Sequence, residues 1–355
     1  MKASIRPGAV TASALLACLL GATVILQCLP AVAQSARPAP QPSPHAIDIP
    51  SWFTESFLDL RDDVKEAAAR NKRLLIYFGQ DGCPYCTALM RDNFGREDIA
   101  DQTRRHFDAI ALNIWGDREV TWIDGKTRSE KEFAAALKVQ FTPTLLFLDE
   151  KGGVVLRANG YYPPQKFRAA LDFASMKTAS QAGFADYLRQ VERAGSGPRR
   201  AQPFFAKPPY RLNRPSAPAG KPIAVLFEQR QCSECDELHA HGFKDREILA
   251  LLDKFGVVRL DLSGGESLIT PEGKTVTEEQ WARALKVSYA PTWVLFDAGG
   301  KEVFRVEAYV KKYHLASSLD YVASGAYLKQ PNFQRFAQDR ADRMRARGVS
   351  VDLWK

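Results

Sequence analysis

The chain of 355 residues has little that could act as a covalent staple or a membrane anchor. It contains only six cysteines, and no apolar run after residue 33 is long enough to span a bilayer. It also lacks a glycine-rich phosphate loop and any spacing of Ser, His and Asp typical of a hydrolytic triad. These absences exclude a multispanning membrane protein and leave nucleotide-dependent and hydrolytic functions without support.

A strong charge of one sign is also absent. The net charge of +8 falls to +6 when Lys2 and Arg6 are removed with an N-terminal signal, and the remaining charges are mixed in sign. The densest basic region, residues 335–347, interleaves Asp339 and Asp342 with arginines, which is typical of a solvated helix face. Docking to an anionic lipid or partner is the alternative for this region. Because the charges are mixed in sign along the chain, we expect no nucleic-acid partner.

Residues 1–33 have the layout of a secretory signal. Lys2 and Arg6 precede a weakly polar stretch over residues 9–29, and Pro30 and the small residues 31–33 follow. The stretch is longer than the usual ~7–15 residues, so an uncleaved membrane anchor is the alternative, and a lipoprotein site at Cys18 is a third. We expect a periplasmic or otherwise extracytoplasmic protein that is soluble after cleavage and touches the membrane only through an uncleaved signal.

Two cysteines, Cys18 and Cys28, lie within this signal. The mature chain keeps two C-x-x-C pairs: Cys83 with Cys86, and Cys232 with Cys235. Disulfides that act as staples close long loops, whereas these loops are too short to restrict the unfolded chain. The pattern indicates that the cysteines serve chemistry and not structure.

The chain is an internal duplication. An offset of 149 residues aligns the two cysteine pairs, and an offset of 148 aligns residues 138–144 with 286–292. Each copy is domain-sized and ends in a trailing helix, so the repeat is not a solenoid. The predicted organisation is: signal 1–33, Pro-rich linker 34–50, domain 51–195, linker 196–220, domain 221–348 and tail 349–355.

Each copy has the pattern of an α/β domain with a mixed central sheet flanked by helices. Two capping boxes, residues 129–132 and 277–280, open the same helix in both copies. For the first copy the sequence predicts these elements: helix 58–69, strand 73–78 buried on both faces, helix 86–94, strand 109–115, a turn at 124–125, strands 144–149 and 154–156, and helix 164–173.

A strand followed by C-x-x-C at the start of a helix places the first sulfur where unpaired N–H groups favour a negative charge. Cys83 is therefore the predicted nucleophile and Cys86 the resolving cysteine. Pro84 suits the first helical turn, and we expect Tyr85, between the cysteines, to be exposed and to contribute to substrate binding.

These residues resemble the thioredoxin superfamily over residues 51–176 and, more weakly, 221–330. The Pro-Tyr dipeptide is similar to that of glutaredoxins, and residues 113–120 with the following Asp-Gly insertion resemble SoxW-type periplasmic thioredoxins. The resemblance implies a cis-proline beside each cysteine pair and an adjacent backbone that binds an extended substrate segment. The residues in those positions are Thr142 and Pro143 in the first copy, and Ala290 and Pro291 in the second.

Two departures from that resemblance concern proton transfer and charge. The buried Asp that thioredoxins carry six residues before the first cysteine is replaced by Tyr77 and Leu226, and we consider Asp81, Glu228 or water as substitutes. In the second pair, Glu234 places a carboxylate beside the thiols and opposes thiolate formation. We therefore expect Cys232 to be less nucleophilic than Cys83.

The sequence thus predicts an exported thiol–disulfide oxidoreductase that needs no cofactor. We expect a reductase or electron relay that acts on protein thiols and disulfides, and the resemblance implies a membrane thiol transporter as electron donor. A disulfide oxidase or isomerase is the first alternative, since direction depends on potential. The second is a copper-handling module that binds the metal through Cys232, Cys235 and His239.

Overall fold

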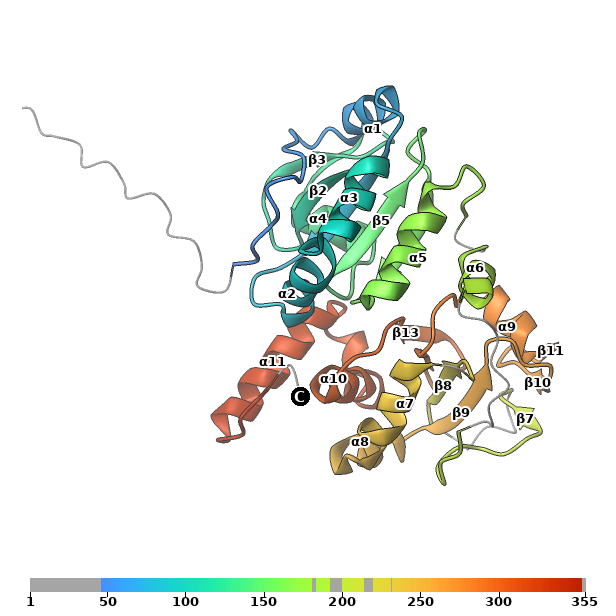
Figure 1. Ribbon diagram of the computed structural model, residues 1–355. Coiled ribbons are helices and arrows are strands. Elements are labelled where there is room, and N and C mark those ends of the chain that lie inside the picture. Colours follow the sequence, from blue (N-terminus) through green and yellow to red (C-terminus); the bar gives the residue numbers. More distant parts are fainter. Residues whose placement is uncertain (1–45, 181–182, 192–199, 214–219, 231, 353–355) are drawn as a thin grey trace, which may run out of the picture. The chain divides into compact units, whose positions relative to one another are not determined.

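The computed structural model describes residues 46–180, 183–191, 200–213, 220–230 and 232–352 (Figure 1). The predicted signal, Cys18 and Cys28 lie outside the described residues. Among the described helices, none combines the length and apolar content that a bilayer crossing requires.

The first domain is built around the sheet β2-β1-β5-β6, in which β1 pairs parallel with β2 and antiparallel with β5. Its elements are α1 (Leu60–Ala69), β1 (Arg73–Gly79), α2 (Pro84–Ala88), a π-helical continuation (Leu89–Phe94), α3 (Glu97–His106), β2 (Phe107–Asn113), β3 (Glu119–Thr121), β4 (Thr127–Ser129), α4 (Glu130–Ala136), β5 (Thr144–Leu148), β6 (Val154–Asn159), α5 (Pro164–Ser175) and α6 (Phe184–Val191). The predicted mixed sheet flanked by helices is confirmed.

The second domain repeats this order in the sheet β13-β12-β8-β9. Its elements are β7 (Tyr210–Arg211), β8 (Ile223–Glu228), α7 (Ser233–Ala240), α8 (Arg246–Leu252), β9 (Gly256–Asp261), β10 (Ser267–Ile269), β11 (Thr275–Thr277), α9 (Glu278–Ala284), β12 (Thr292–Phe296), β13 (Glu302–Val306), α10 (Lys312–Ala323) and the trailing helix α11 (Phe333–Ala346). Strand β7 lies in the segment assigned to a linker from the sequence, and it pairs with β10.

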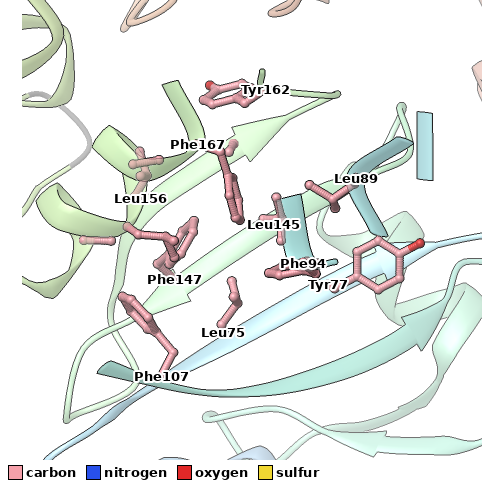
Figure 2. Close-up of a cluster of buried hydrophobic side chains, with 14 of the residues drawn as sticks. Leu75, Tyr77, Leu89, Phe94, Phe107, Leu145, Phe147, Leu156, Tyr162 and Phe167 are labelled. Atoms are coloured by element: carbon pink, nitrogen blue, oxygen red, sulfur yellow. The ribbon is translucent and has the colours of Figure 1, made fainter. Parts of the chain in front are cut away.

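Both faces of the first sheet are buried, as the apolar run of β1 predicts. All seven residues of β1 are buried. Alternate residues contribute to opposite faces. Leu75 and Tyr77 join one apolar cluster, together with Phe147 and Phe167 (Figure 2). Leu74 and Ile76 join another cluster on the opposite face. The strand is therefore held from both sides, which fixes the position of the loop that follows it and carries Cys83.

The two capping boxes are present as predicted. At the start of α4, Ser129 and Glu132 exchange side-chain and backbone hydrogen bonds, and Thr277 and Gln280 do so at the start of α9. Each box satisfies two helix N–H groups that would otherwise have no partner. The repeat seen in the sequence is therefore also a repeat of local structure.

Two candidate redox centres

The first cysteine pair lies directly after β1, at the start of α2. Cys83 is the N-cap residue, and its Sγ accepts a hydrogen bond from the Cys86 backbone N–H at 3.1 Å. The two residues are joined by a disulfide, and both are buried. A sulfur at this position receives an N–H donor in addition to the favourable end of the helix dipole, and both stabilise a thiolate.

The loop before β5 brings a second donor to the same sulfur. The Thr142–Pro143 peptide bond is cis, as the family resemblance implied. Thr142 Oγ1 lies 3.3 Å from Cys83 Sγ, and the Thr142 carbonyl oxygen lies 3.4 Å from it. Thr142 and Pro143 are thus next to the disulfide; their role in binding a substrate stays a prediction.

Tyr85 is not exposed, contrary to the sequence-based expectation. Only 8% of its surface is accessible. Its hydroxyl accepts a hydrogen bond from the Lys311 backbone N–H at 2.8 Å, and its ring packs edge-on against His314, with ring centroids 5.0 Å apart. The expectation failed because the residues that cover Tyr85 come from the second domain. Burial raises the pKa of Tyr85 and lowers that of His314 to about 4.

A cavity of about 520 Å³ opens in front of Cys83. Its wall on the first domain includes Cys83, Tyr85 and Thr142, and α10 and α11 line it from the second domain. This volume is within the range of pockets that bind small molecules. Cys83, although only 4% exposed, thus lines a cavity to which both domains contribute residues.

The second cysteine pair repeats the local geometry. Cys232 is the N-cap residue of α7, its Sγ accepts the Cys235 N–H at 3.1 Å, and a disulfide joins the two. The Ala290–Pro291 bond is cis. Because Ala290 stands where the first copy has Thr142, the second centre has no hydroxyl at this position.

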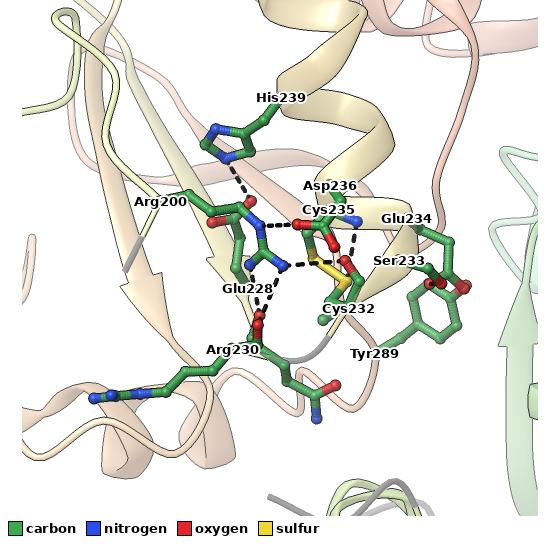
Figure 3. The surroundings of a disulfide bond; sticks show 12 residues. Arg200, Glu228, Arg230, Cys232, Ser233, Glu234, Cys235, Asp236, His239 and Tyr289 are labelled. Atoms are coloured by element: carbon green, nitrogen blue, oxygen red, sulfur yellow. Dashed lines mark hydrogen bonds and ion pairs between the residues drawn. A yellow bond between two sulfur atoms is a disulfide. The ribbon is translucent and has the colours of Figure 1, made fainter. Parts of the chain in front are cut away.

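Glu234, the third residue of the second motif, is paired with a cation. Its carboxylate lies 3.0 Å from Lys166 Nζ of α5, and the two side chains are each 11% exposed. Tyr289, which is labelled beside Glu234 in Figure 3, donates its hydroxyl to the same carboxylate at 3.2 Å. Although burial alone would raise the pKa of Glu234, the charge and hydrogen bond of Lys166 hold it below its ordinary value. The negative charge expected to oppose a Cys232 thiolate is therefore largely offset.

Lys166 also covers the backbone beside the second pair. Its Nζ donates to the Ala290 carbonyl oxygen at 3.1 Å and lies 4.4 Å from the centroid of the Tyr289 ring. That ring is stacked on Tyr162 of the first domain, with centroids 4.5 Å apart. The carbonyl that an extended substrate would use at the second centre is already occupied by a side chain of the first domain.

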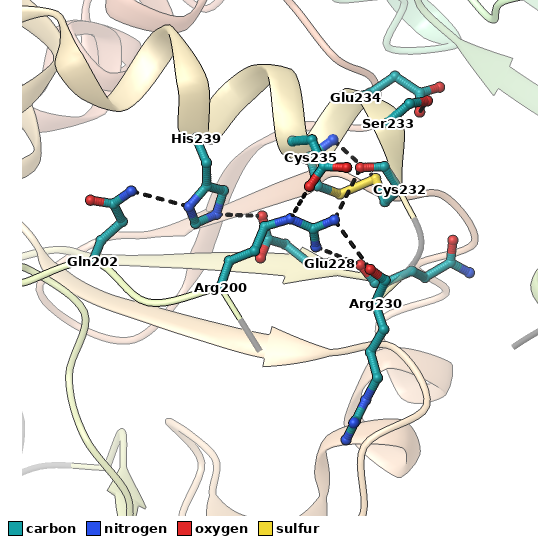
Figure 4. Close-up of polar contacts among 11 residues, drawn as sticks. Arg200, Gln202, Glu228, Arg230, Cys232, Ser233, Glu234, Cys235 and His239 are labelled. Carbon is teal, nitrogen blue, oxygen red and sulfur yellow. Dashed lines mark hydrogen bonds and ion pairs between the residues drawn. A yellow bond between two sulfur atoms is a disulfide. The ribbon is translucent and has the colours of Figure 1, made fainter. Parts of the chain in front are cut away.

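Arg200, from the segment between the domains, clamps the loop that carries Cys232 (Figures 3 and 4). Its guanidinium donates to the carbonyl oxygens of Gln229 at 2.8 Å and of Arg230 and Cys232 at 3.2 Å each, and its Nε donates to Asp236 at 2.6 Å. Three backbone acceptors are thereby satisfied by one fork of N–H donors. The clamp places a positive charge beside the second disulfide.

His239 forms a buried pair with Glu228 at the end of β8 (Figure 4). Its Nε2 lies 2.9 Å from Glu228 Oε1, and its Nδ1 lies 3.2 Å from the Gln202 amide nitrogen. Both ring nitrogens are thus engaged by side chains other than the cysteines. Within the described ranges, no group of three or more His, Cys, Asp or Glu residues is arranged to hold a metal ion. The copper hypothesis for Cys232, Cys235 and His239 gains no support from this arrangement.

Two segments of the chain, one in each domain, match a known domain family. The model of the thioredoxin-like domain family matches residues 60–175 and 216–323, which together exceed half of the chain. The chain belongs to this family. A sequence comparison with curated proteins finds no match.

Several solved structures are similar to parts of these thioredoxin-like domains. A thioredoxin-fold protein from Helicobacter pylori is 30% identical and covers 30% of this chain and 70% of its own, with a TM-score of 0.27. A thioredoxin from Thermus thermophilus is 23% identical over 32% of this chain and 82% of its own (TM-score 0.26). A disulphide isomerase from Xylella fastidiosa is 16% identical over 28% of this chain and 69% of its own (TM-score 0.22).

An uncharged residue, Tyr77 or Leu226, lies six positions before the first cysteine of each pair, where thioredoxins carry a buried Asp. Tyr77 is buried below the first centre, and within the described residues its hydroxyl has no hydrogen-bond partner. Burial raises the pKa of Tyr77, with a smaller contribution from Asp81, so its hydroxyl stays protonated. Leu226 is fully buried. Of the substitutes considered, Glu228 is the carboxylate that lies buried at the second centre.

Three residues of these centres were not identified from the sequence: Lys166, Arg200 and Gln80. Gln80 belongs to the first centre, where its Nε2 donates to Thr142 Oγ1 at 3.0 Å. Lys166 and Arg200 lie far from either cysteine pair in the chain and belong to no motif. Gln80 was the only one with a usable signal, because the 149-residue offset aligns it with Gln229 just as it aligns the cysteines. A polar residue retained in both copies three positions before a nucleophile indicates a role at the centre.

Replacing His239 by Phe should lower the free energy of unfolding by about 1–3 kcal/mol, because Glu228 would remain buried without its donor. The aromatic ring retains the contacts with Phe205 and Phe243. Urea denaturation followed by circular dichroism measures the change. The matched control is the double variant Glu228→Leu, His239→Phe, which removes both polar groups and should recover most of the loss. An equal loss in the double variant would contradict a role through this pair.

Proposed function

We propose that this protein is an exported thiol–disulfide reductase that reduces protein disulfides at the Cys83 centre. Two thioredoxin-like domains with close cysteine pairs fit a thiol–disulfide oxidoreductase. The observation that carries the proposal is the position of Cys83 Sγ. This sulfur has the Cys86 N–H at 3.1 Å and the Thr142 hydroxyl at 3.3 Å, and it faces a cavity of about 520 Å³.

The reaction begins when the Cys83 thiolate attacks one sulfur of a substrate disulfide. A mixed disulfide forms, and the other substrate sulfur leaves as a thiolate. Cys86 then attacks the Cys83 sulfur, which closes the Cys83–Cys86 disulfide and releases the second substrate thiolate. The substrate gains two electrons and takes up protons from water, and the domain loses two electrons. An external dithiol must supply two electrons before the next cycle.

The second centre serves in this proposal as an internal or donor-side pair and not as a second substrate site. Lys166 occupies the Ala290 carbonyl oxygen that strand addition would need. For the electron donor we propose a membrane thiol transporter, on the basis of the resemblance to SoxW-type proteins. Export is proposed from the signal-like residues 1–33.

The reductase activity is tested with the Cys232→Ser, Cys235→Ser variant, which retains only the first pair. We expect this variant to reduce insulin with dithiothreitol as donor at no less than about half the wild-type rate, because the first pair contains both the nucleophile and the resolving cysteine. Insulin turbidity measures the rate. Loss of activity in this variant would assign substrate reduction to the second centre, and inactivity of the wild type would refute the reductase.

One observation favours the opposite direction as a second candidate. Donors that stabilise the Cys83 thiolate also stabilise the reduced pair, which makes the disulfide more oxidising. Equilibration of the first pair with glutathione separates the two functions. A potential near the value of about −270 mV for thioredoxin supports the reductase, and one near about −120 mV supports an oxidase.

A further inference from the structure

Gln80 lies between β1 and Cys83, and its side-chain amide has a fixed orientation. The indole N–H of Trp115 donates to Gln80 Oε1 at 2.6 Å. Because an indole nitrogen can only donate, the amide oxygen must face Trp115 and the NH₂ group must face the opposite way. That NH₂ group lies 3.0 Å from Thr142 Oγ1.

This orientation determines where the Thr142 hydroxyl hydrogen points. The hydroxyl has one hydrogen to donate, and Oγ1 already accepts from Gln80. Cys83 Sγ lies 3.3 Å from Oγ1 and is an acceptor in both the disulfide and the thiolate state. The hydroxyl hydrogen is therefore directed at the sulfur.

Helix α11 of the second domain fixes the other side of the Gln80 amide. Gln334 Oε1 accepts from Gln80 Nε2 at 2.9 Å. Gln334 is itself oriented, because its Nε2 donates to the Gln140 carbonyl oxygen at 2.8 Å. The Gln80 NH₂ group thus donates along two branches: through Gln334 to the Gln140 carbonyl oxygen, and through the Thr142 hydroxyl to the sulfur of Cys83.

We propose that Gln80 is a positioning residue of the first redox centre: it turns the Thr142 hydroxyl toward Cys83 Sγ, and Gln334 of the second domain holds it in that orientation. The inference deepens the proposed reductase function, because it assigns part of the activation of its nucleophile to a chain of side chains that the family motif does not contain.

The second centre provides an internal comparison. Gln229 corresponds to Gln80, but Ala290 replaces Thr142 and offers no hydroxyl. Beside Cys232, the Arg200 guanidinium donates to the Cys232 carbonyl oxygen at 3.2 Å and not to the sulfur (Figure 3). The two copies therefore use different polar groups beside the same N-cap cysteine.

The test is a double-mutant cycle on the pKa of Cys83 in the reduced Cys232→Ser, Cys235→Ser protein. The pKa is read from the pH dependence of iodoacetamide alkylation at Cys83, followed by peptide mass spectrometry. Thr142→Val should raise it by about one unit, so that alkylation below the pKa is about tenfold slower, as expected for loss of a donor to a thiolate. Gln80→Leu should raise it by a similar amount.

The decisive result is the double variant Gln80→Leu, Thr142→Val, which should match Thr142→Val alone. Thr142→Ser keeps the hydroxyl and should restore the wild-type value, and Gln334→Leu should give a smaller rise. The matched control Gln229→Leu removes the corresponding amide of the second domain and should leave the pKa of Cys83 unchanged. Where Gln80→Leu reduces folding, judged by circular dichroism, Gln334→Leu with and without Thr142→Val supplies the same cycle.

Two outcomes would overturn the inference: an unchanged Cys83 pKa in Thr142→Val, or an equal additional rise when Gln80→Leu is added to Thr142→Val. The second outcome would mean that Gln80 acts by packing. Insulin reduction is measured separately on the same proteins. A wild-type protein without reductase activity, but with a Cys83 pKa that depends on Gln80 through Thr142, would refute the proposed function and leave this inference intact.

Discussion

Replacing Cys83 by Ser should abolish disulfide reduction at the first centre, with a loss on the order of a thousandfold or more, as is usual when a nucleophile is removed. A serine hydroxyl is not ionised at neutral pH, so the donors at 3.1 and 3.3 Å would have no thiolate to stabilise. The measurement is insulin reduction in the Cys232→Ser, Cys235→Ser protein, in which the second pair cannot compensate.

The matched control is Cys86→Ser, the same chemical change three residues further on. Cys83 can still attack in this variant, but no second thiolate follows, so a mixed disulfide with the substrate should accumulate. Mass spectrometry of the unreduced protein identifies the linked cysteine. Full activity of Cys83→Ser, or a mixed disulfide located on Cys86 in the wild-type sequence, would refute the assignment of the nucleophile.

Replacing Lys166 by Met should lower the free energy of unfolding by about 3–5 kcal/mol. The side chains of the Lys166–Glu234 pair are each 11% exposed, and removing Lys166 leaves the largely buried Glu234 carboxylate without a cation to balance its charge. Chemical denaturation measures the change. The control Arg168→Met removes another cation of α5, whose partner Asp98 belongs to the same domain and is about half exposed, and should cost less than about 1 kcal/mol.

The same pair predicts a pH dependence. Glu234 has a pKa below its ordinary value of 4.5 in the folded protein, so the folded state binds fewer protons than the unfolded chain as the pH falls. The contribution of the pair to stability is therefore complete above about pH 4.5 and is lost as the pH falls through the folded pKa of Glu234. In Lys166→Met this component of acid destabilisation should disappear. The double variant Lys166→Met, Glu234→Gln should regain most of the stability at neutral pH, and failure to do so would show that Lys166 acts by packing alone.

The sequence was sufficient for those parts of the fold that depend on local pattern. The apolar run of β1 and the two capping boxes fix their elements through neighbouring residues, so they were predicted correctly. Helix α3 was not predicted, because only Ile99, Ala100 and Thr103 of its ten residues are buried and its polar face dominates the pattern. A helix that buries so little leaves a weak periodic signal.

At the candidate sites, too, the features that depend on neighbouring residues were predicted and those that depend on distant segments were not. The cysteines and the residues before each cis-proline follow from motif and resemblance. Tyr85 was wrongly expected to be exposed, and the cation that pairs with Glu234 was not predicted. The groups that contact these two residues, the Lys311 backbone and the Lys166 side chain, come from the other copy. Contacts between distant segments are set by how the domains pack, and no local spacing encodes that packing.

The positions of Tyr85 and Glu234 have a consequence for motif-exchange experiments. Each is the third residue of its C-x-x-C motif, and each is held by a group from the opposite copy. Swapping the Pro-Tyr and Ser-Glu dipeptides between the two motifs is a direct way to change the redox potential of each pair. In this chain the swap would also remove both of these contacts. Any change in redox behaviour would then combine an altered potential with weaker contact between the two domains. Each redox motif here also holds the two domains together. Grafting it onto a single isolated domain would therefore transfer the cysteine pair and its dipeptide without this interdomain contact.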